Sequence, residues 1–262
     1  MNRNIITVPV RRVESGSNVT EQDLVAVEEP LQIRVNGSDF AITMRTPGQD
    51  RELAAGFLLS EGIVHGASQI AGIASDERGT VTVTLAPGVE VNVAGRNFYV
   101  TSSCGVCGKA SIDGLRATDC PTLARGIPKV PGSLISELPD KLRTAQPVFA
   151  HTGGLHAAGL FDSAGNLVAA REDVGRHNAV DKLIGAALLG GKIPLSNNIL
   201  MLSGRISFEL VQKALMAGIP IVAAVGAPSS LAIETALQFG LTLIGFVRGQ
   251  RYNVYAGHDR LV

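Results

Sequence analysis

Tryptophan is absent from this 262-residue chain, and aromatic residues make up only 4% of it. Cysteine is almost as scarce, because the chain has three, which excludes a disulfide framework of the kind found in small secreted proteins. Neither positive nor negative charge is in excess. The 23 Lys and Arg balance the 23 Asp and Glu, so no global field recruits nucleic acid or an anionic membrane.

Long apolar runs are lacking as well. Gly, Pro or a charged residue interrupts each hydrophobic stretch before it is long enough to span a bilayer. The N-terminus shows no apolar core of a signal peptide. We therefore expect a soluble, cytoplasmic protein without a membrane segment, in which thiols stay reduced unless they react.

The first part of the chain, residues 1–120, is predicted to be β-rich. Alternating segments at 31–35 and 40–44 flank Asn36-Gly37, a typical hairpin turn. Five prolines between 121 and 147 predict an irregular connector with a short helix near 133–143. The other elements predicted in the first part are strands at 79–85, 89–93 and 98–101 and a helix at 50–60.

Residues 148–262 have a different pattern, in which short apolar strands alternate with helices. This pattern predicts an α/β domain with a parallel sheet covered on both faces. The domain begins with a hairpin whose turn lies at 162–165. The elements expected after it are helices at 176–189, 207–217 and 230–239 and strands at 199–202, 221–225 and 241–246.

Three strand-to-helix junctions of this domain are rich in Gly, Ser and Arg. Helix N-termini at the carboxyl ends of strands attract anions, so their convergence predicts a phosphate-bearing ligand. Taken singly, a serine such as Ser207 or Ser230 is more simply explained as a helix cap. From the junctions alone, the candidate ligand contacts are Ser203, Arg205, Ser229 and Ser230, with Arg176 as a further phosphate partner.

The most informative motif is Cys104-Gly-Val-Cys107, which is followed by Gly108 and Lys109. Cysteine reacts as the thiolate, and a nearby lysine favours that form, so the pair indicates chemistry or metal binding. The third thiol, Cys120, has no partner at motif spacing and is interpreted as structural.

Zinc binding is disfavoured because a site needs three or four ligands and the pair supplies two. His151, His156 and His177 are candidate partners, yet the pattern of the zinc deaminases is missing around them. His156 is interpreted as a packed imidazole, and for His177 a structural and a ligand-contacting role remain equally open.

For the cysteine pair, thiol–disulfide exchange is the second interpretation. The first is sulfur carriage, in which a thiolate holds sulfur as a reversible persulfide.

Several long phrases of this sequence, in order, resemble the formate dehydrogenase accessory sulfurtransferase family, FdhD. They include residues 44–48, 102–108, 171–182 and 203–213, and the resemblance extends from residue 28 to residue 255. It implies a cytidine-deaminase-like three-layer α/β/α fold and a homodimer. A shared fold does not transfer the deaminase reaction, which the motifs argue against.

The resemblance also implies an activity. Such a protein takes sulfur from a cysteine desulfurase as a cysteine persulfide and passes it to the molybdenum of the bis-molybdopterin guanine dinucleotide cofactor, which formate dehydrogenase requires. By motif position, Cys104 is the expected carrier and Cys107 cooperates in transfer. A non-catalytic cofactor chaperone and a thiol–disulfide oxidoreductase remain alternatives. The implied cofactor-binding segment comprises Phe246, Val247, Arg248, Gly249, Gln250 and Arg251.

Overall fold

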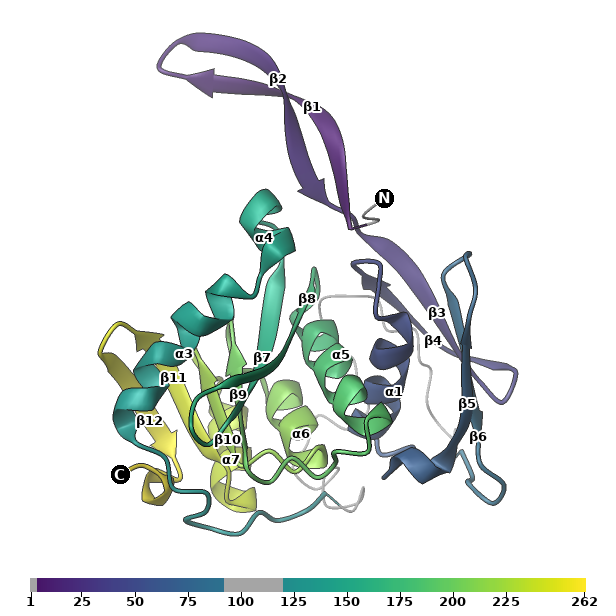
Figure 1. Cartoon of the computed structure of the whole chain (residues 1–262), viewed down its shortest axis with the longest axis vertical. Helices are drawn as coiled ribbons and strands as arrows, with labels where there is room; N and C mark the ends of the chain where they lie inside the picture. Colours follow the sequence, from purple (N-terminus) through teal and green to yellow (C-terminus); the bar gives the residue numbers. More distant parts are fainter. Residues whose placement is uncertain (1–3, 92–119) are drawn as a thin grey trace.

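The computed structural model describes residues 4–91 and 120–262, whose strands form three sheets (Figure 1). The largest sheet has six strands, built from β7 (His156–Asp162), β8 (Leu167–Asp173), β9 (Asn198–Leu202), β10 (Ile221–Ala224), β11 (Thr242–Arg248) and β12 (Arg251–Ala256). Their order across the sheet is β12-β11-β10-β9-β7-β8.

This sheet is mixed, which corrects the expectation of a parallel one. β9, β10 and β11 are parallel, whereas β7 pairs antiparallel with β8 and with β9, and β12 pairs antiparallel with β11. The cause is the two tight hairpins, because a strand that returns through a short turn must reverse its direction. β8 consequently runs the same way as β9, so the carboxyl ends of β8 to β11 lie at one edge.

Helices cover both faces of the large sheet, so this part has the three layers α/β/α. One face carries α3 (Gly132–Thr144), whose apolar stripe of Leu134, Ile135, Leu138 and Leu142 is buried. The helix predicted near 133–143 is therefore confirmed, and it continues through Pro139. The other face carries α5 (Arg176–Leu189), α6 (Phe208–Met216) and α7 (Ser230–Phe239).

The second sheet belongs to the first part of the chain and has the order β4-β3-β6-β5. Asn36 and Gly37 have φ angles of 49° and 82°, which confirms the tight turn predicted for them. Residues 89–91 are not in a strand, and β6 pairs with β5 instead. The elements are β3 (Glu29–Val35), β4 (Ser38–Arg45), α1 (Asp50–Ser60), β5 (Ile70–Ser75) and β6 (Thr80–Leu85).

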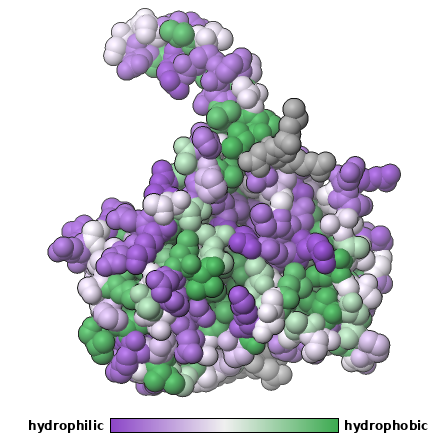
Figure 2. Space-filling model, in the orientation of Figure 1, coloured by the Kyte–Doolittle hydropathy of each residue, from purple (hydrophilic) through white to green (hydrophobic). Residues whose placement is uncertain are grey.

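A two-stranded ribbon of β1 (Ile5–Glu14) and β2 (Ser17–Ala26) was not predicted. It projects from the body, near the short helix α4 (Pro147–Thr152), and bears both hydrophilic and hydrophobic side chains (Figures 1 and 2). Arg12 and Glu21 form an ion pair across its strands. Among the described residues, no helix is long and apolar enough to cross a membrane.

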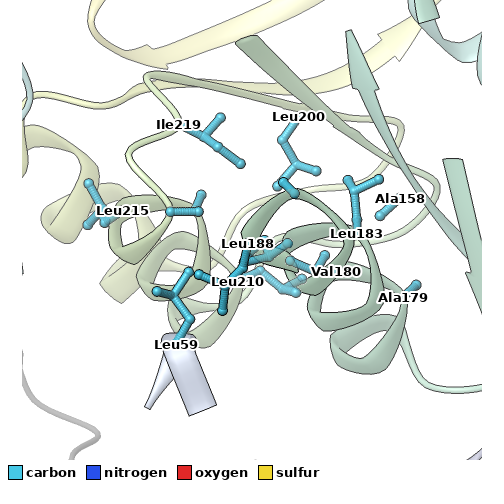
Figure 3. Close-up of a cluster of buried hydrophobic side chains, with 14 of the residues drawn as sticks. Leu59, Ala158, Ala179, Val180, Leu183, Leu188, Leu200, Leu210, Leu215 and Ile219 are labelled. Carbon is cyan, nitrogen blue, oxygen red and sulfur yellow. The ribbon is translucent and has the colours of Figure 1, made fainter. Parts of the chain in front are cut away.

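The two parts of the chain share one hydrophobic core. Leu59 of α1 belongs to the same buried cluster as Leu188 of α5, Leu200 of β9 and Leu210 of α6 (Figure 3). Where α1 crosses α5, the contact is made by glycine on both sides. A Cβ atom on Gly56 would lie 1.9 Å from the carbonyl oxygen of Asp181, so only glycine allows this approach.

Candidate functional site

The predicted junctions meet at the carboxyl edge of the large sheet, where backbone hydrogen bonds join them. Gly226 N–H donates to the carbonyl of Gly204 over 3.1 Å, and Phe246 N–H donates to the carbonyl of Gly226 over 3.1 Å. A Cβ atom on Gly226 would lie 2.7 Å from the Gly204 oxygen, so glycine is required there. The bond from Gly226 joins the junctions predicted at 203–207 and 226–230, after β9 and β10, and the bond from Phe246 adds the segment after β11.

The serines of these junctions differ in what their hydroxyls contact. Ser229 caps α7 by accepting from Ala232 N–H, and Ser203 Oγ accepts from Ala157 N–H over 2.8 Å. Ser207 is the N-cap of α6, yet no cap bond to its side chain is present, and its Oγ lies 3.3 Å from His177 Nε2. Ser229 and Ser230 are exposed, so of the predicted serines these two are the more open to a ligand.

A basic cluster of two histidines and two arginines lies at the same edge. His156 and His177 are half-buried, as is Arg176, while Arg205 is exposed. Burial, followed by the charges of Arg176 and Arg205, lowers the pKa of His156. Burial also lowers the pKa of His177 to about 3, assisted by Lys213 and Arg176. Both imidazoles are therefore neutral at neutral pH, and each can donate one hydrogen bond and accept another but contributes no charge.

The position of His156 was not anticipated, although the sequence held the signal. It is the first residue of β7, and because β7 runs antiparallel to β9, its amino end lies at the carboxyl edge of the parallel strands. The ring fills the space beside Gly204, where a Cβ atom would lie 3.3 Å from His156 Nδ1. Recognising that the 155–170 hairpin reverses the chain would have placed this side chain at the edge.

His177 should make the fold sensitive to acid. Its pKa is 6.5 when unperturbed and about 3 in the folded protein, so the unfolded chain binds the proton more tightly. The contribution of neutral His177 to the free energy of unfolding is therefore fully present above the unfolded pKa, and it is lost as the pH falls towards 3. We expect urea unfolding at about pH 7 and about pH 4 to show a smaller loss of stability for His177→Gln than for the unmodified protein. Parallel pH profiles for the two proteins would contradict this assignment.

The segment predicted to bind a cofactor lies at the β11–β12 hairpin. Phe246 is 38% exposed and has a φ of 55°, a strained conformation for a bulky residue, within β11 where its pairing with β12 shifts register. Arg248, Gly249, Gln250 and Arg251 are exposed at the hairpin tip. Val247 is the exception, since its side chain is only 1% exposed and packs in the core beside α3. Its side chain is therefore directed into the core and not towards the exposed hairpin tip.

The two cysteines singled out from the sequence, Cys104 and Cys107, lie outside the described residues. Cys120 is half-buried, and burial raises the pKa of its thiol to about 12. It therefore stays protonated and unreactive at neutral pH. In residues 4–91 and 120–262, no group of three or more His, Cys, Asp and Glu side chains could hold a metal ion.

Comparison with known proteins finds relatives over nearly the whole chain. The model of the FdhD/NarQ family matches residues 26–262. The sulfur carrier protein FdhD of Streptomyces avermitilis is 53% identical, covering 96% of this chain and 94% of that protein. The FdhD of Sulfurisphaera tokodaii is 45% identical over 97% and 98%. A crystal structure of a proposed formate dehydrogenase accessory protein from Desulfotalea psychrophila has a TM-score of 0.80 at 27% identity, covering 98% and 99%.

Proposed function

Because this chain belongs to the FdhD/NarQ family, we propose that it is a sulfur carrier that supports formate dehydrogenase. The observation that carries this proposal is its 53% identity, over 96% of its length, to a relative named a sulfur carrier protein. In the proposed reaction, a cysteine desulfurase is the sulfur donor, and the molybdenum of bis-molybdopterin guanine dinucleotide is the acceptor. The expected assembly is a homodimer.

Cys104 is the proposed carrier. Its thiolate attacks the terminal sulfur of the persulfide on the donor, a new S–S bond forms on Cys104, and the donor cysteine leaves as a thiolate. Cys107 can then attack the inner sulfur of the Cys104 persulfide. That step forms the Cys104–Cys107 disulfide and expels the outer sulfur as hydrosulfide, so electrons balance without another oxidant. Two thiols at this spacing thus supply both loading and release.

The carboxyl edge of the large sheet is the proposed binding site for the guanine dinucleotide. Arg205, Arg248 and Arg251 are exposed, and guanidinium groups pair well with phosphate. Phe246 offers an exposed ring on which a base can stack, and its strained backbone indicates a conformation kept for contact rather than for packing. The glycines of the junctions leave the backbone accessible to a ligand that needs close approach.

Mass spectrometry of the intact protein and its peptides tests the sulfur-carrying step. After incubation with a cysteine desulfurase and cysteine, we expect one additional sulfur atom on the peptide that contains Cys104. A reductant should remove it, because a persulfide is reducible. An unmodified cysteine pair would favour a cofactor chaperone. A pair that forms an internal disulfide without releasing hydrosulfide would favour a thiol–disulfide oxidoreductase, because the proposed release step yields hydrosulfide together with that disulfide.

A further inference from the structure

Asp173, the last residue of β8, lies at the centre of a buried polar cluster that the proposed reaction does not use. Its side chain is 0% exposed and has four partners. They come from three places in the chain: the end of β4, the junction after β8, and helix α5. The carboxylate contacts Lys182 Nζ at 2.7 Å, Gly175 N–H at 2.8 Å, Asn178 Nδ2 at 3.1 Å and Thr46 N–H at 3.2 Å.

Stability alone is a poor explanation for this cluster. Lys182 is also 0% exposed, and its Nζ donates to the Thr46 carbonyl over 2.8 Å as well as pairing with Asp173. Removing two such charges from water costs several kcal/mol per ion, so well-packed apolar residues of the same volume would often be at least as stable. The pair instead holds backbone segments in place, because one oxygen of Asp173 accepts from Gly175 N–H and the other accepts from Thr46 N–H.

The group that Asp173 fixes is the start of α5. Gly175 is the N-cap of this helix, Arg176 and His177 are its first two residues, and Asn178 follows them. Asn178 is held from the other side as well, because its Nδ2 donates to the Met44 carbonyl over 2.7 Å. With Gly175 and Asn178 both bonded to Asp173, the two residues between them have little freedom. His177 is thereby brought to 3.3 Å from Ser207 Oγ, at the edge where the junctions meet.

We propose that Asp173 is a positioning residue that holds Arg176 and His177 in place as part of the ligand site at the carboxyl edge. Arg176 would then pair with a phosphate group, and His177 would offer a neutral imidazole as a hydrogen-bond partner. The identity of that ligand rests on the proposed function, whereas the positioning does not. Neither Arg176 nor His177 lies in residues 246–251, the cofactor-binding segment that the family resemblance implies.

The first test measures the positioning directly, through the rate at which diethyl pyrocarbonate modifies His177. The exposed His151 serves as an internal reference in the same peptide digest. In Asp173→Asn the buried lysine loses its counter-charge, so the double variant Asp173→Asn/Lys182→Met is included to restore folding. We expect His177 to react several-fold faster in both variants, relative to His151, because the start of α5 is no longer fixed.

Arg260→Met is the matched control for lost stability. Arg260 is also 0% exposed, and it donates to the Gly240 carbonyl over 2.8 Å and to Thr242 Oγ1 over 2.9 Å. Thr242 begins β11, so this cluster lies at the opposite edge of the sheet. Its loss should lower the melting temperature while the reactivity of His177 stays unchanged. Faster labelling in this control would mean that the effect at Asp173 is one of general stability, and the proposal would fail.

The second measurement is guanosine diphosphate binding by calorimetry, with guanosine as a probe that lacks phosphate. In the folded Asp173 variants we expect guanosine diphosphate to bind about tenfold more weakly, the loss of one charge-assisted contact. The Arg260 control should bind normally. Unchanged His177 labelling together with unchanged affinity would overturn the positioning role. If the unmodified protein binds no guanosine diphosphate, the proposed ligand is wrong, and the His177 labelling still decides the role of Asp173.

Discussion

Replacing Cys104 with alanine is expected to abolish sulfur loading while leaving the fold intact. A persulfide needs a thiolate to accept the sulfur, and alanine has no group that can replace it. The effect is therefore a complete loss and not a reduced rate. Transfer of labelled sulfur from a cysteine desulfurase, followed by mass spectrometry under non-reducing conditions, measures it. Circular dichroism of the variant checks that the fold is retained.

The third cysteine supplies the control. Burial raises the pKa of Cys120 to about 12, so its thiol is protonated at neutral pH and Cys120→Ala should load sulfur normally. Cys107→Ala separates the roles of the pair. If Cys107 only releases the sulfur, this variant should load and retain it. Normal loading of Cys104→Ala would mean that another residue is the carrier.

Elements with a strong local pattern were predictable from the sequence. The helix expected at 50–60 is α1 (Asp50–Ser60), and the one expected at 230–239 is α7 (Ser230–Phe239). The first has acidic residues in its first turn, and the second is capped by Ser229 and ends at Gly240. The β1–β2 ribbon was not predictable, because its exposed strands bury no consistent face and so lack the alternation that reveals a half-buried strand.

The candidate site was predictable where it follows from local sequence and missed where it depends on tertiary pairing. The junctions after β9 and β10 are recognisable in the sequence by their Gly, Ser and Arg residues. The location of His156 at this edge requires the strand order, and the four partners of Asp173 require contacts between β4, β8 and α5. Sequence spacing contains no information on such contacts, because Thr46 and Asp173 are far apart in the sequence and come into contact only in the folded protein.

The crossing of α1 and α5 leads to the second large prediction, that Gly185→Ala strongly destabilises the protein. A Cβ atom at Gly185 would lie 1.8 Å from the carbonyl oxygen of Glu52, and backbone cannot give way as a side-chain end can. The two helices must therefore move apart, which opens the core shared by both parts of the chain. Overpacking of this kind should cost roughly 3 kcal/mol or more. Urea unfolding monitored by circular dichroism measures the change.

Gly72→Ala is the control because it makes the same chemical change in open space. Gly72 lies in β5, a Cβ atom there would have no neighbour within 4 Å, and its φ is not positive. This variant should be neutral or slightly more stable, since alanine restricts the unfolded chain. The difference between the two substitutions then isolates the helix contact from the general effect of losing a glycine. If Gly185→Ala and Gly72→Ala have the same urea midpoint, the close contact between α1 and α5 does not contribute to the stability of the protein, and the prediction is wrong.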